Sequence, residues 1–359
     1  MRGAVARNIL KAWLLVGLLA AAFAGIGWLL ADLRGAVLFA FCSLLAATAA
    51  YAVGDRALLG MLGARPFALA EDPLLRSTAD RVAAQLQIPP PKLQLIDDTF
   101  PRAFVVGRGP GGATLAVSTG LLTALPPPEI GAVVAHELVH VRTRDVLPQT
   151  YAVLLSTTLL EISRVGGFLA RFLLAVLAPI GAAFTHLLLS SKRELRADAI
   201  AAGIVDPHDL ADALIRLDRA AELVEFHASP TTEPLYTVSP FDEADRVTRM
   251  FATHPPLAER VSRLRHLGEE HSSKRELRAD AVAAGVVDPH DLADALIRLD
   301  RAAELVEFHA SPATEPLYTV SPFDEAERVT RMFATHPPLA ERVSRLRNLG
   351  EGRSSERNG

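Results

Sequence analysis

One segment of this 359-residue chain decides its fold, Pro126-Pro127-Pro128-Glu129-Ile130-Gly131-Ala132-Val133-Val134-Ala135-His136-Glu137-Leu138-Val139-His140. The prolines followed by a carboxylate are typical of the first turn of a helix, where an amide hydrogen is not needed and negative charge is favoured. We expect this helix to run to about Arg144. The apolar run before His136 predicts a half-buried helix, on which His136 and His140 lie one above the other on one face.

The spacing of the two histidines predicts a metal site. Imidazoles at positions i and i+4 of a helix can both reach one zinc ion at about 2.0–2.1 Å. Glu137, between them, is placed to take a proton from a zinc-bound water, which could then attack a peptide carbonyl. The alternative is a pair of hydrogen-bonded histidines on an ordinary helix, but a half-buried helix gives such histidines few polar partners. We therefore expect one Zn²⁺ per chain and hydrolytic chemistry.

A catalytic zinc needs a third protein ligand and an open position. Thr143 and Val146 stand where the metzincin pattern requires glycine and histidine, so that class is excluded. Glu194, in Glu194-Leu195-Arg196-Ala197-Asp198, is the leading candidate for the third ligand. Asp198 lies one turn further on the same face and could orient a ligand or pair with a cation. Alone, this short motif would also fit a solvated helix start.

The remaining periodicity predicts a mainly α protein with a small β-sheet, the α+β class. Apolar spacing predicts a helix over 74–86, and further helices are expected at Glu194-Leu195-Arg196, after Asp206-Pro207 and after Pro255-Pro256. Strands are expected at 92–96, 103–106 and 113–117. The glycine-rich link between the last two predicts that they form a hairpin.

Two charge-free apolar runs, 12–31 and 35–54, predict a transmembrane hairpin, because about 20 such residues span a bilayer as a helix. A cleaved signal peptide is the competing interpretation of the first run, but the run is long and a second follows at once. Basic residues before the first run predict a cytoplasmic N-terminus: Arg2, Arg7 and Lys11.

A second apolar hairpin is expected over 146–191. Its later run, 172–191, has the length of a span, whereas 146–160 is short and could be tilted, re-entrant or buried. The alternative is that both runs are core helices of a soluble domain. With two hairpins, the chain would return to the cytoplasmic side.

Composition excludes several classes of protein. Hydrophobic residues make up 50% of the chain, and the mean hydropathy is +0.24. The formal net charge of −4 gives no basic surplus for phosphate, so nucleic acid is not an expected partner. Cys42 is the single cysteine, which excludes an intrachain disulfide and a cysteine-based zinc site.

The C-terminal part contains a near-identical tandem repeat. Its two copies begin at Ser190 and Ser272 and differ only mildly, for example Ile200 against Val282 and Asp245 against Glu327. Two copies do not make a solenoid, which needs three or more units. The second copy is therefore expected to be an extra copy of one piece of a domain.

Taken together, these motifs resemble the HtpX-type membrane zinc metalloproteases, relatives of the CAAX prenyl endoproteases. The resemblance covers residues 1 to about 267. Besides the hairpin and the zinc helix, it rests on five stretches: Asp97–Phe104, Gly107–Pro110, Thr119–Leu122, Arg193–Asp198 and Thr253–Arg260. One departure is Arg102, where the family usually has asparagine at the border of the substrate groove.

The resemblance implies a gluzincin-type, zincin-like protease domain. It implies that His136, His140 and Glu194 are the zinc ligands and that Glu137 is the catalytic base. It also implies that His254 lies near the zinc and helps to hold the oxyanion. Asp198 and Arg260 would form a pair beside the ligands.

This organisation predicts six parts: the N-terminal transmembrane hairpin (1–54), the first protease part with the β-hairpin and the zinc helix (55–145), the second apolar hairpin (146–191), the second protease part with the third ligand (192–271), the tandem copy (272–353) and a tail (354–359). The copy repeats residues 190–271.

The resulting hypothesis is a multi-pass zinc endopeptidase of the cell membrane, which cleaves misfolded or membrane-associated proteins on the cytoplasmic side. Its partners would be protein or peptide substrates and the lipid bilayer. A first alternative is a catalytically impaired scaffold, in which the duplicated segment blocks the site. A second alternative is a soluble zinc aminopeptidase, which would require the apolar runs to be core. Substrates and oligomeric state do not follow from the sequence.

Overall fold

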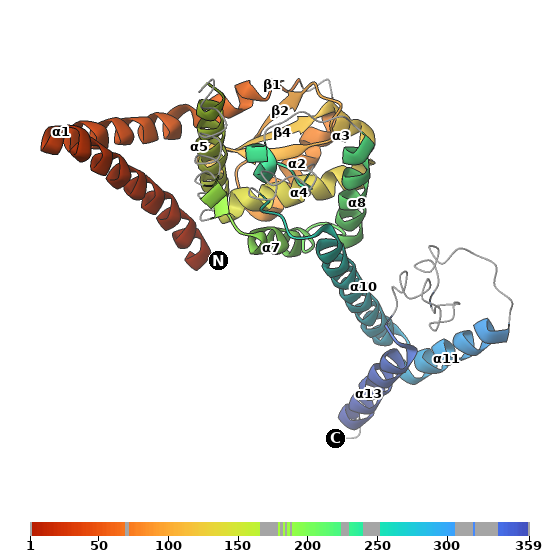
Figure 1. Ribbon diagram of the computed structural model, residues 1–359. Coiled ribbons are helices and arrows are strands. Elements are labelled where there is room, and N and C mark those ends of the chain that lie inside the picture. Colours follow the sequence, from red (N-terminus) through yellow and green to blue (C-terminus); the bar gives the residue numbers. More distant parts are fainter. Residues whose placement is uncertain are drawn as a thin grey trace. The chain divides into compact units, whose positions relative to one another are not determined.

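The computed structural model describes residues 2–68, 72–165, 189–223, 230–239, 252–305 and 337–357, together with 179, 182–183, 185–186 and 319. The chain forms two compact units, residues 1–264 and residues 265–359 (Figure 1). We call the first the body and the second the C-terminal unit. Helix α10 (Leu257–Val286) begins in the body and continues into the C-terminal unit.

Helix α1 (Arg2–Met61) is broken at Ala31 and Asp32, where Asp32 has φ 49° and ψ −143°. The two arms fold back on one another at this break, which coincides with the polar link expected between the two apolar runs (Figure 1). Gly27 and Gly35 face each other beside the turn, and a Cβ on Gly27 would lie 2.2 Å from the carbonyl oxygen of Gly35. Glycine is needed there because any side chain would push the arms apart.

Among the described residues, one stretch, Gly27–Ala49, is long and apolar enough to cross a membrane, and only 6% of it is buried. The N-terminal hairpin was expected to supply two spans. The structure therefore supports one candidate membrane helix, and the two-hairpin topology stays a prediction.

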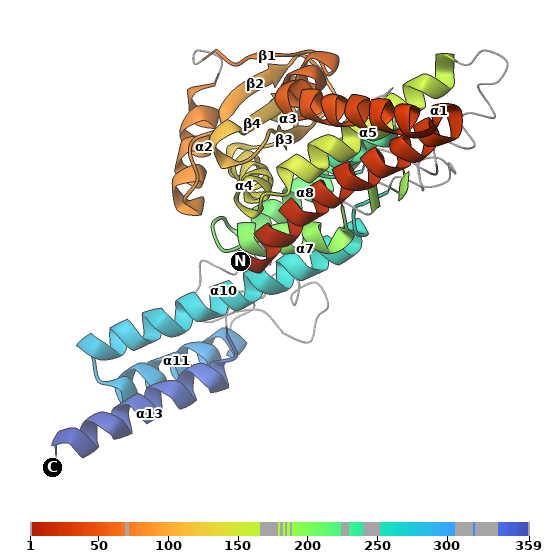
Figure 2. The same cartoon turned by 90° about the vertical axis from the view of Figure 1, so that its left-hand side faces the viewer.

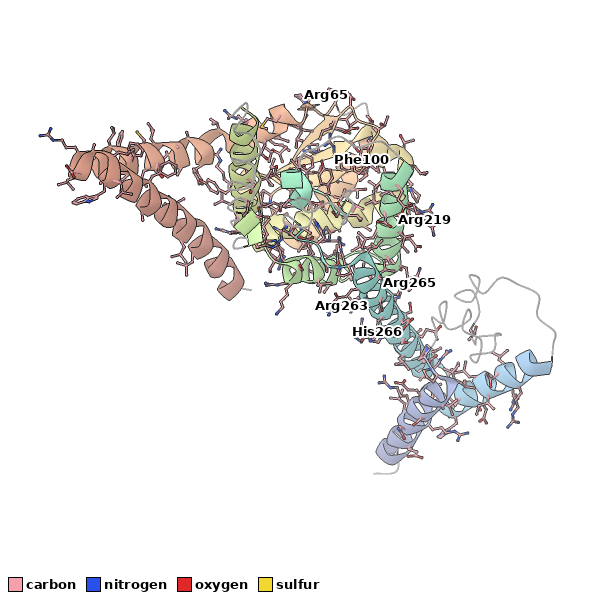
Figure 3. All side chains as sticks on the ribbon, viewed as in Figure 1. Arg65, Phe100, Arg219, Arg263, Arg265 and His266 are labelled. Carbon is pink, nitrogen blue, oxygen red and sulfur yellow. The ribbon has the colours of Figure 1, made fainter. Side chains whose placement is uncertain are left out.

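The sheet has four strands in the order β1-β2-β4-β3. They are β1 (Ala64–Pro66), β2 (Lys92–Ile96), β3 (Ala103–Val106) and β4 (Thr114–Ser118). The hairpin expected from the glycine-rich link is confirmed, because β3 pairs antiparallel with β4. β2 pairs parallel with β4, and β1, which was not expected, adds to β2 antiparallel. Arg65 (Figure 3), on the edge strand β1, forms an ion pair of 2.8 Å with Asp97, which follows β2.

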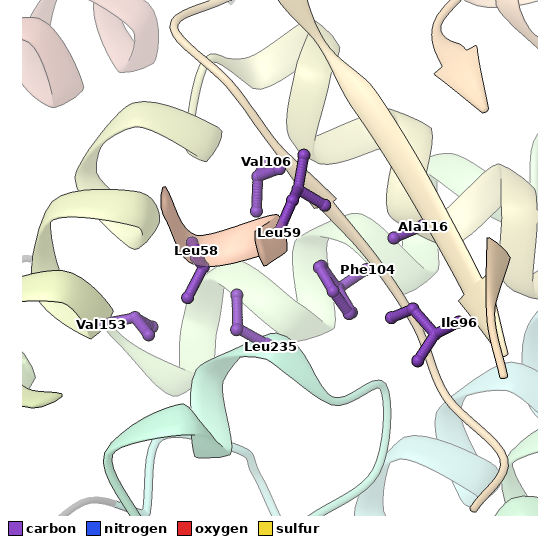
Figure 4. Close-up of a cluster of buried hydrophobic side chains, with 8 residues drawn as sticks. All are labelled: Leu58, Leu59, Ile96, Phe104, Val106, Ala116, Val153 and Leu235. Carbon is purple, nitrogen blue, oxygen red and sulfur yellow. The ribbon is translucent and has the colours of Figure 1, made fainter. Parts of the chain in front are cut away.

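Every residue of β3 and β4 is buried, so both faces of the sheet are covered. On one face, the end of α1, helix α5 (Val146–Val165) and the 3₁₀ turn η3 (Pro230–Leu235) supply a cluster of apolar side chains (Figure 4). The cluster, called here the sheet-face core, consists of Leu58, Leu59, Ile96, Phe104, Val106, Ala116, Val153 and Leu235.

The helix that carries the two histidines, α4 (Pro127–Thr143), lies at the centre of the body. It contacts β3 and packs against three helices, α2 (Pro73–Leu86), α7 (Ser191–Ala201) and α8 (Pro207–Leu223) (Figure 2). It begins at Pro127, as the proline run predicted, and ends at Arg144 in the left-handed conformation. The short α3 (Thr119–Ala124) follows β4 and packs on α8. The expected helices over 74–86 and after Pro207 are confirmed.

The first half of the predicted second hairpin is part of the body. Val146, Ala152 and Val153 of α5 are fully buried, and α5 packs against α1 and η3. This agrees with the buried-helix interpretation of the run 146–160. The later run, 172–191, lies mostly outside the described residues, so its prediction as a span is not tested.

The C-terminal unit contains α11 (Pro289–Leu305), α13 (Leu339–Arg357) and the later part of α10. Its own small core contains Ala284, Ala293, Leu296 and Leu346. These helices correspond, one repeat later, to α8, to the start of α10 and to α7. The described helices of the second copy thus repeat helices of the first.

Candidate metal centre

Two neighbouring helices bring the predicted ligands together. The Nε2 atoms of His136 and His140, both on α4, lie 3.2 Å and 3.5 Å from Oε2 of Glu194 on α7. The three residues are buried, and their ligand atoms all lie within 4.8 Å of one another. In the part of the chain that the structure describes, no other group of histidine, cysteine or acidic side chains meets this criterion.

This geometry fits a zinc ion. A tetrahedral ion with ligands at about 2.0–2.1 Å has edges of about 3.3–3.4 Å between ligand atoms. Two edges of the present cluster measure 3.2 Å and 3.5 Å. Two imidazole nitrogens and one carboxylate oxygen also form a typical donor set of catalytic zinc, which leaves a fourth position open.

His136 is oriented by a buried pair behind it. Its Nδ1 lies 2.8 Å from Oδ1 of Asp198, and both carboxylate oxygens of Asp198 accept hydrogen bonds from Arg260 at 2.8 Å. Arg260 is only 1% exposed, so its charge is balanced by buried carboxylates, chiefly that of Asp198. The ring of His136 is thereby held with Nε2 toward the cluster, as is usual for histidines that bind metals. The structure thus contains the Asp198–Arg260 pair that the resemblance implied.

His140 has a looser partner. Its Nδ1 lies 3.6 Å from Oδ2 of Asp145, and that oxygen accepts a hydrogen bond of 2.6 Å from Thr143. Asp145 follows Arg144 directly, so the left-handed turn that ends α4 also brings Asp145 back toward His140.

Glu194 has its two oxygens in different roles. Oε2 faces the histidines, while Oε1 accepts hydrogen bonds from Nε and Nη2 of Arg193 at 3.0 Å and 2.8 Å. Arg193 donates in turn to Gln149 on α5, whose amide donates to the carbonyl of Pro234 at 2.6 Å. Sequence reasoning missed Gln149 and assigned no role to Arg193; the only signal was the adjacency of Arg193 to Glu194.

Glu137 is buried on α4, and its Oε1 accepts a hydrogen bond of 2.9 Å from the hydroxyl of Thr237. The carbonyl of Thr237 accepts from the buried Arg260. Sequence reasoning missed Thr237 as well. It lies in irregular chain just after η3, one hundred residues beyond Glu137, and belongs to no motif that could have pointed to it.

His254 and Arg102 lie at the border of the cluster. Nε2 of His254 is 4.0 Å from Oε2 of Glu194, beyond direct hydrogen-bonding distance. Arg102 points inward, where it pairs with Asp98 at 2.6 Å and reaches the hydroxyl of Tyr236 at 3.4 Å. The side chain that departs from the family pattern therefore holds the chain next to Thr237.

The charges of the cluster depend on one another. Burial lowers the pKa of His140, but Glu194 and Asp145 outweigh it and raise that pKa to about 9. Burial likewise opposes Asp198 and Glu194 at His136, whose pKa is raised overall. Burial would raise the pKa of Glu194, but Arg193 and the two histidines hold it well below its usual value. Without a metal the two histidines therefore bind a proton more readily than a free imidazole does, and metal binding would displace such a proton.

Burial also raises the pKa of Glu137, and the positive histidines only partly oppose this. A carboxylate with a raised pKa is better suited to accept and return a proton near neutral pH. The group between the two histidines thus has the environment of a general base.

Comparison with known proteins agrees with this geometry. The family model described as peptidase family M48 matches residues 69–268 and, again, residues 266–350. A "Protease HtpX homolog" of Acidiphilium cryptum is 38% identical over 285 residues, which cover 74% of this chain and 99% of that protein. Another, of Pelotomaculum thermopropionicum, is 34% identical over 276 residues and covers 72% and 98%. The crystal structure of S. mikatae Ste24p aligns with a TM-score of 0.39 and 17% identity, over 74% of this chain and 66% of that chain.

Proposed function

The chain belongs to peptidase family M48, as an HtpX-type zinc metalloprotease, and from this premise we propose that it is a membrane-integral endopeptidase. Its substrates would be misfolded or membrane-associated proteins, cleaved on the cytoplasmic side of the cell membrane. The observation that carries the proposal is the convergence of His136, His140 and Glu194 on one point. Beside them lies the buried carboxylate of Glu137, one oxygen of which accepts a hydrogen bond from Thr237.

The site residues fall into two groups, the metal ligands and the residue that would transfer protons. His136, His140 and Glu194 would hold one zinc ion, which when bound supplies a Lewis acid for the substrate carbonyl and for the attacking water. Glu137 would accept the proton of that water and return it to the leaving amine. Because Thr237 occupies Oε1 of Glu137, the other oxygen is the one available for this transfer.

The remaining roles concern orientation. Asp198 and Arg260 would keep Nε2 of His136 directed at the ion. His254 would donate to the oxyanion that develops on the carbonyl oxygen, from its place at the border of the cluster. Among the described strands β3 pairs only with β4, so substrate would lie along the free side of this hairpin as an added strand.

Membrane attachment is supported by the outward side chains of α1. Trp28, Leu29, Leu30 and Phe41 are between 54% and 84% exposed. A run of such residues along a hairpin is unfavourable in water and fits a bilayer. The six-part organisation proposed from the sequence accommodates this arrangement, with the zinc site assembled from 55–145 and 192–271.

A cleavage assay on detergent-extracted protein tests the proposal. We expect zinc-loaded wild-type protein to degrade an unfolded, fluorescently labelled casein and to stop when the zinc is chelated. The matched variant is Glu137→Gln, which keeps the ligands but has no base. Zinc-loaded wild-type protein that is no more active than this variant would contradict the proposal and favour the non-catalytic scaffold.

A further inference from the structure

The body has a cavity of about 620 Å³ between the start of α7 and the start of α10. Its charged lining comes from Lys192 and Arg196 on α7 and from Glu259 and Arg263 on α10. Arg263 projects from the end of α10 that belongs to the body (Figure 3). His254, which precedes α10, forms part of the same lining.

The charges of this cavity do not cancel. Arg263 pairs with Glu259 at 3.0 Å, one turn away on α10. Lys192 and Arg196 lie one turn apart on α7, and neither has a carboxylate partner among the described residues. Both are exposed, so the positive charge is available to a ligand from solvent.

The cavity borders the metal centre. His254 lines the cavity and also lies 4.0 Å from Oε2 of Glu194, the ligand oxygen. On α7, Glu194 is buried and faces the histidines, while Lys192 and Arg196, two residues to either side, face solvent. Because α7 presents the two positive charges on the side away from Glu194, a peptide held at the metal centre would reach them by extending past His254, which lines both places.

We propose that this cavity is a substrate subsite for a carboxylate, supplied by an aspartate or glutamate side chain or by the C-terminus of the substrate. The proposal rests on the proposed endopeptidase function and adds a preference to it. A guanidinium and an ammonium group are the usual binders of carboxylates, the first by paired hydrogen bonds and the second as a point charge. The neighbouring Leu195, Pro255 and Pro256 supply apolar wall for the stem of such a side chain.

The tandem repeat provides a matched control. Lys274 and Arg278 stand in the same local sequence as Lys192 and Arg196, Ser-Lys-Arg-Glu-Leu-Arg-Ala-Asp. They belong to the C-terminal unit, whose described residues contain no metal-binding cluster. K192E/R196E and K274E/R278E therefore change the net charge equally within the same eight-residue sequence, but only the first pair belongs to the body, which holds the metal centre.

The experiment compares peptides in which one glutamate is moved through the positions around the cleaved bond with a neutral parent peptide. A further pair carries a free or an amidated C-terminus, which separates the two sources of carboxylate. We expect wild-type protein to favour the best carboxylate peptide by about three- to tenfold in kcat/KM, the range of one or two partly exposed ion pairs. K192E/R196E should lose this ratio and favour lysine at the same position, whereas K274E/R278E should keep the wild-type ratio. Zinc content and Tm of each variant report folding.

Four results would overturn the subsite. Equal changes of the ratio in both charge-reversed variants would indicate a general effect of net charge. Loss of binding to vesicles of phosphatidylcholine and phosphatidylglycerol by K192E/R196E, with an unchanged peptide ratio, would assign the two cations to lipid. Zinc-loaded wild-type protein that cleaves neutral and carboxylate peptides equally would overturn the subsite alone. Zinc-loaded protein that cleaves no peptide would overturn the proposed function and the subsite together.

Discussion

Glu194 and Glu276 occupy the same place in the two copies of the repeat, and replacing each by glutamine measures how different their surroundings have become. Glu194 is 2% exposed and lies 3.2 Å and 3.5 Å from the two histidines. Glu276 is part-exposed and lies 3.1 Å from Arg342, in a unit whose described residues contain no HExxH helix. Side-chain chemistry is the same, so only the fold can separate the two results.

The free-energy cost expected for replacing Glu194 is several times larger than that for replacing Glu276. A four-ligand zinc site contributes about 10–16 kcal/mol, so the loss of one ligand costs about 3 kcal/mol, or about a hundredfold in zinc affinity. The Glu276–Arg342 pair is partly solvated and is worth about 0.2–1 kcal/mol of stability, with no effect on zinc.

Zinc affinity is measured by competition with a chromophoric chelator, and metal content by elemental analysis of the purified membrane protein. Glu194→Gln should bind zinc about a hundredfold more weakly and lose peptidase activity, while Glu276→Gln should match wild type in both. Deletion from Ser272 onward should also leave both intact. Loss of zinc in Glu276→Gln, or its retention in Glu194→Gln, would refute the reasoning, and loss only in the double variant would mean that either copy can supply the ligand.

Four further predictions follow from the site and the hairpin. Glu137→Gln should retain zinc and lose at least about a hundredfold in kcat, because the ligands stay while the base is removed; activity near that of wild type would contradict the assigned role. Thr237→Val should lower kcat about ten- to a hundredfold with zinc content unchanged, and Thr237→Ser should restore it, since only the hydroxyl holds Glu137. In metal-free protein the pKa of His140 is raised to about 9, so its positive charge stabilises the fold fully below pH 6.5, and this stabilisation is lost as the pH rises through 9. The Tm measured in excess chelator should therefore fall between pH 6.5 and 9. A Tm that rises over this interval would contradict the prediction. Reporters fused after Gly54 and after Gly359 should both indicate the cytoplasm, and an external signal from either would exclude the four-span topology.

The parts that the sequence predicted well are those with a short, regular period. The i, i+4 histidines needed only a helix, and the proline run ensured its start, so α4 and the place of Glu137 could be predicted from local residues. The strands β2 and β3 have the predicted bounds, and β4 is shifted by one residue.

The parts that were missed depend on contacts between distant segments. β1 is only three residues long and follows a helix directly, so it has no pattern of its own. Thr237 acts on a residue one hundred positions away, and Gln149 lies in a run whose apolar character predicted a membrane segment. Such partners are chosen by tertiary packing, and neither period nor propensity indicates them.

The final turns of α1 end in the sheet-face core, where Leu58 and Leu59 pack with Phe104, and only Leu62 and Gly63 separate the helix from β1. Helix α1 therefore packs directly into the core of the sheet, and no flexible linker separates the two. Proteolytic nicking at this junction would remove two buried leucines, each worth about 2–5 kcal/mol. Separation of the rest of the body from α1 would therefore inactivate it instead of releasing a free enzyme, so activity stays confined to wherever α1 is held.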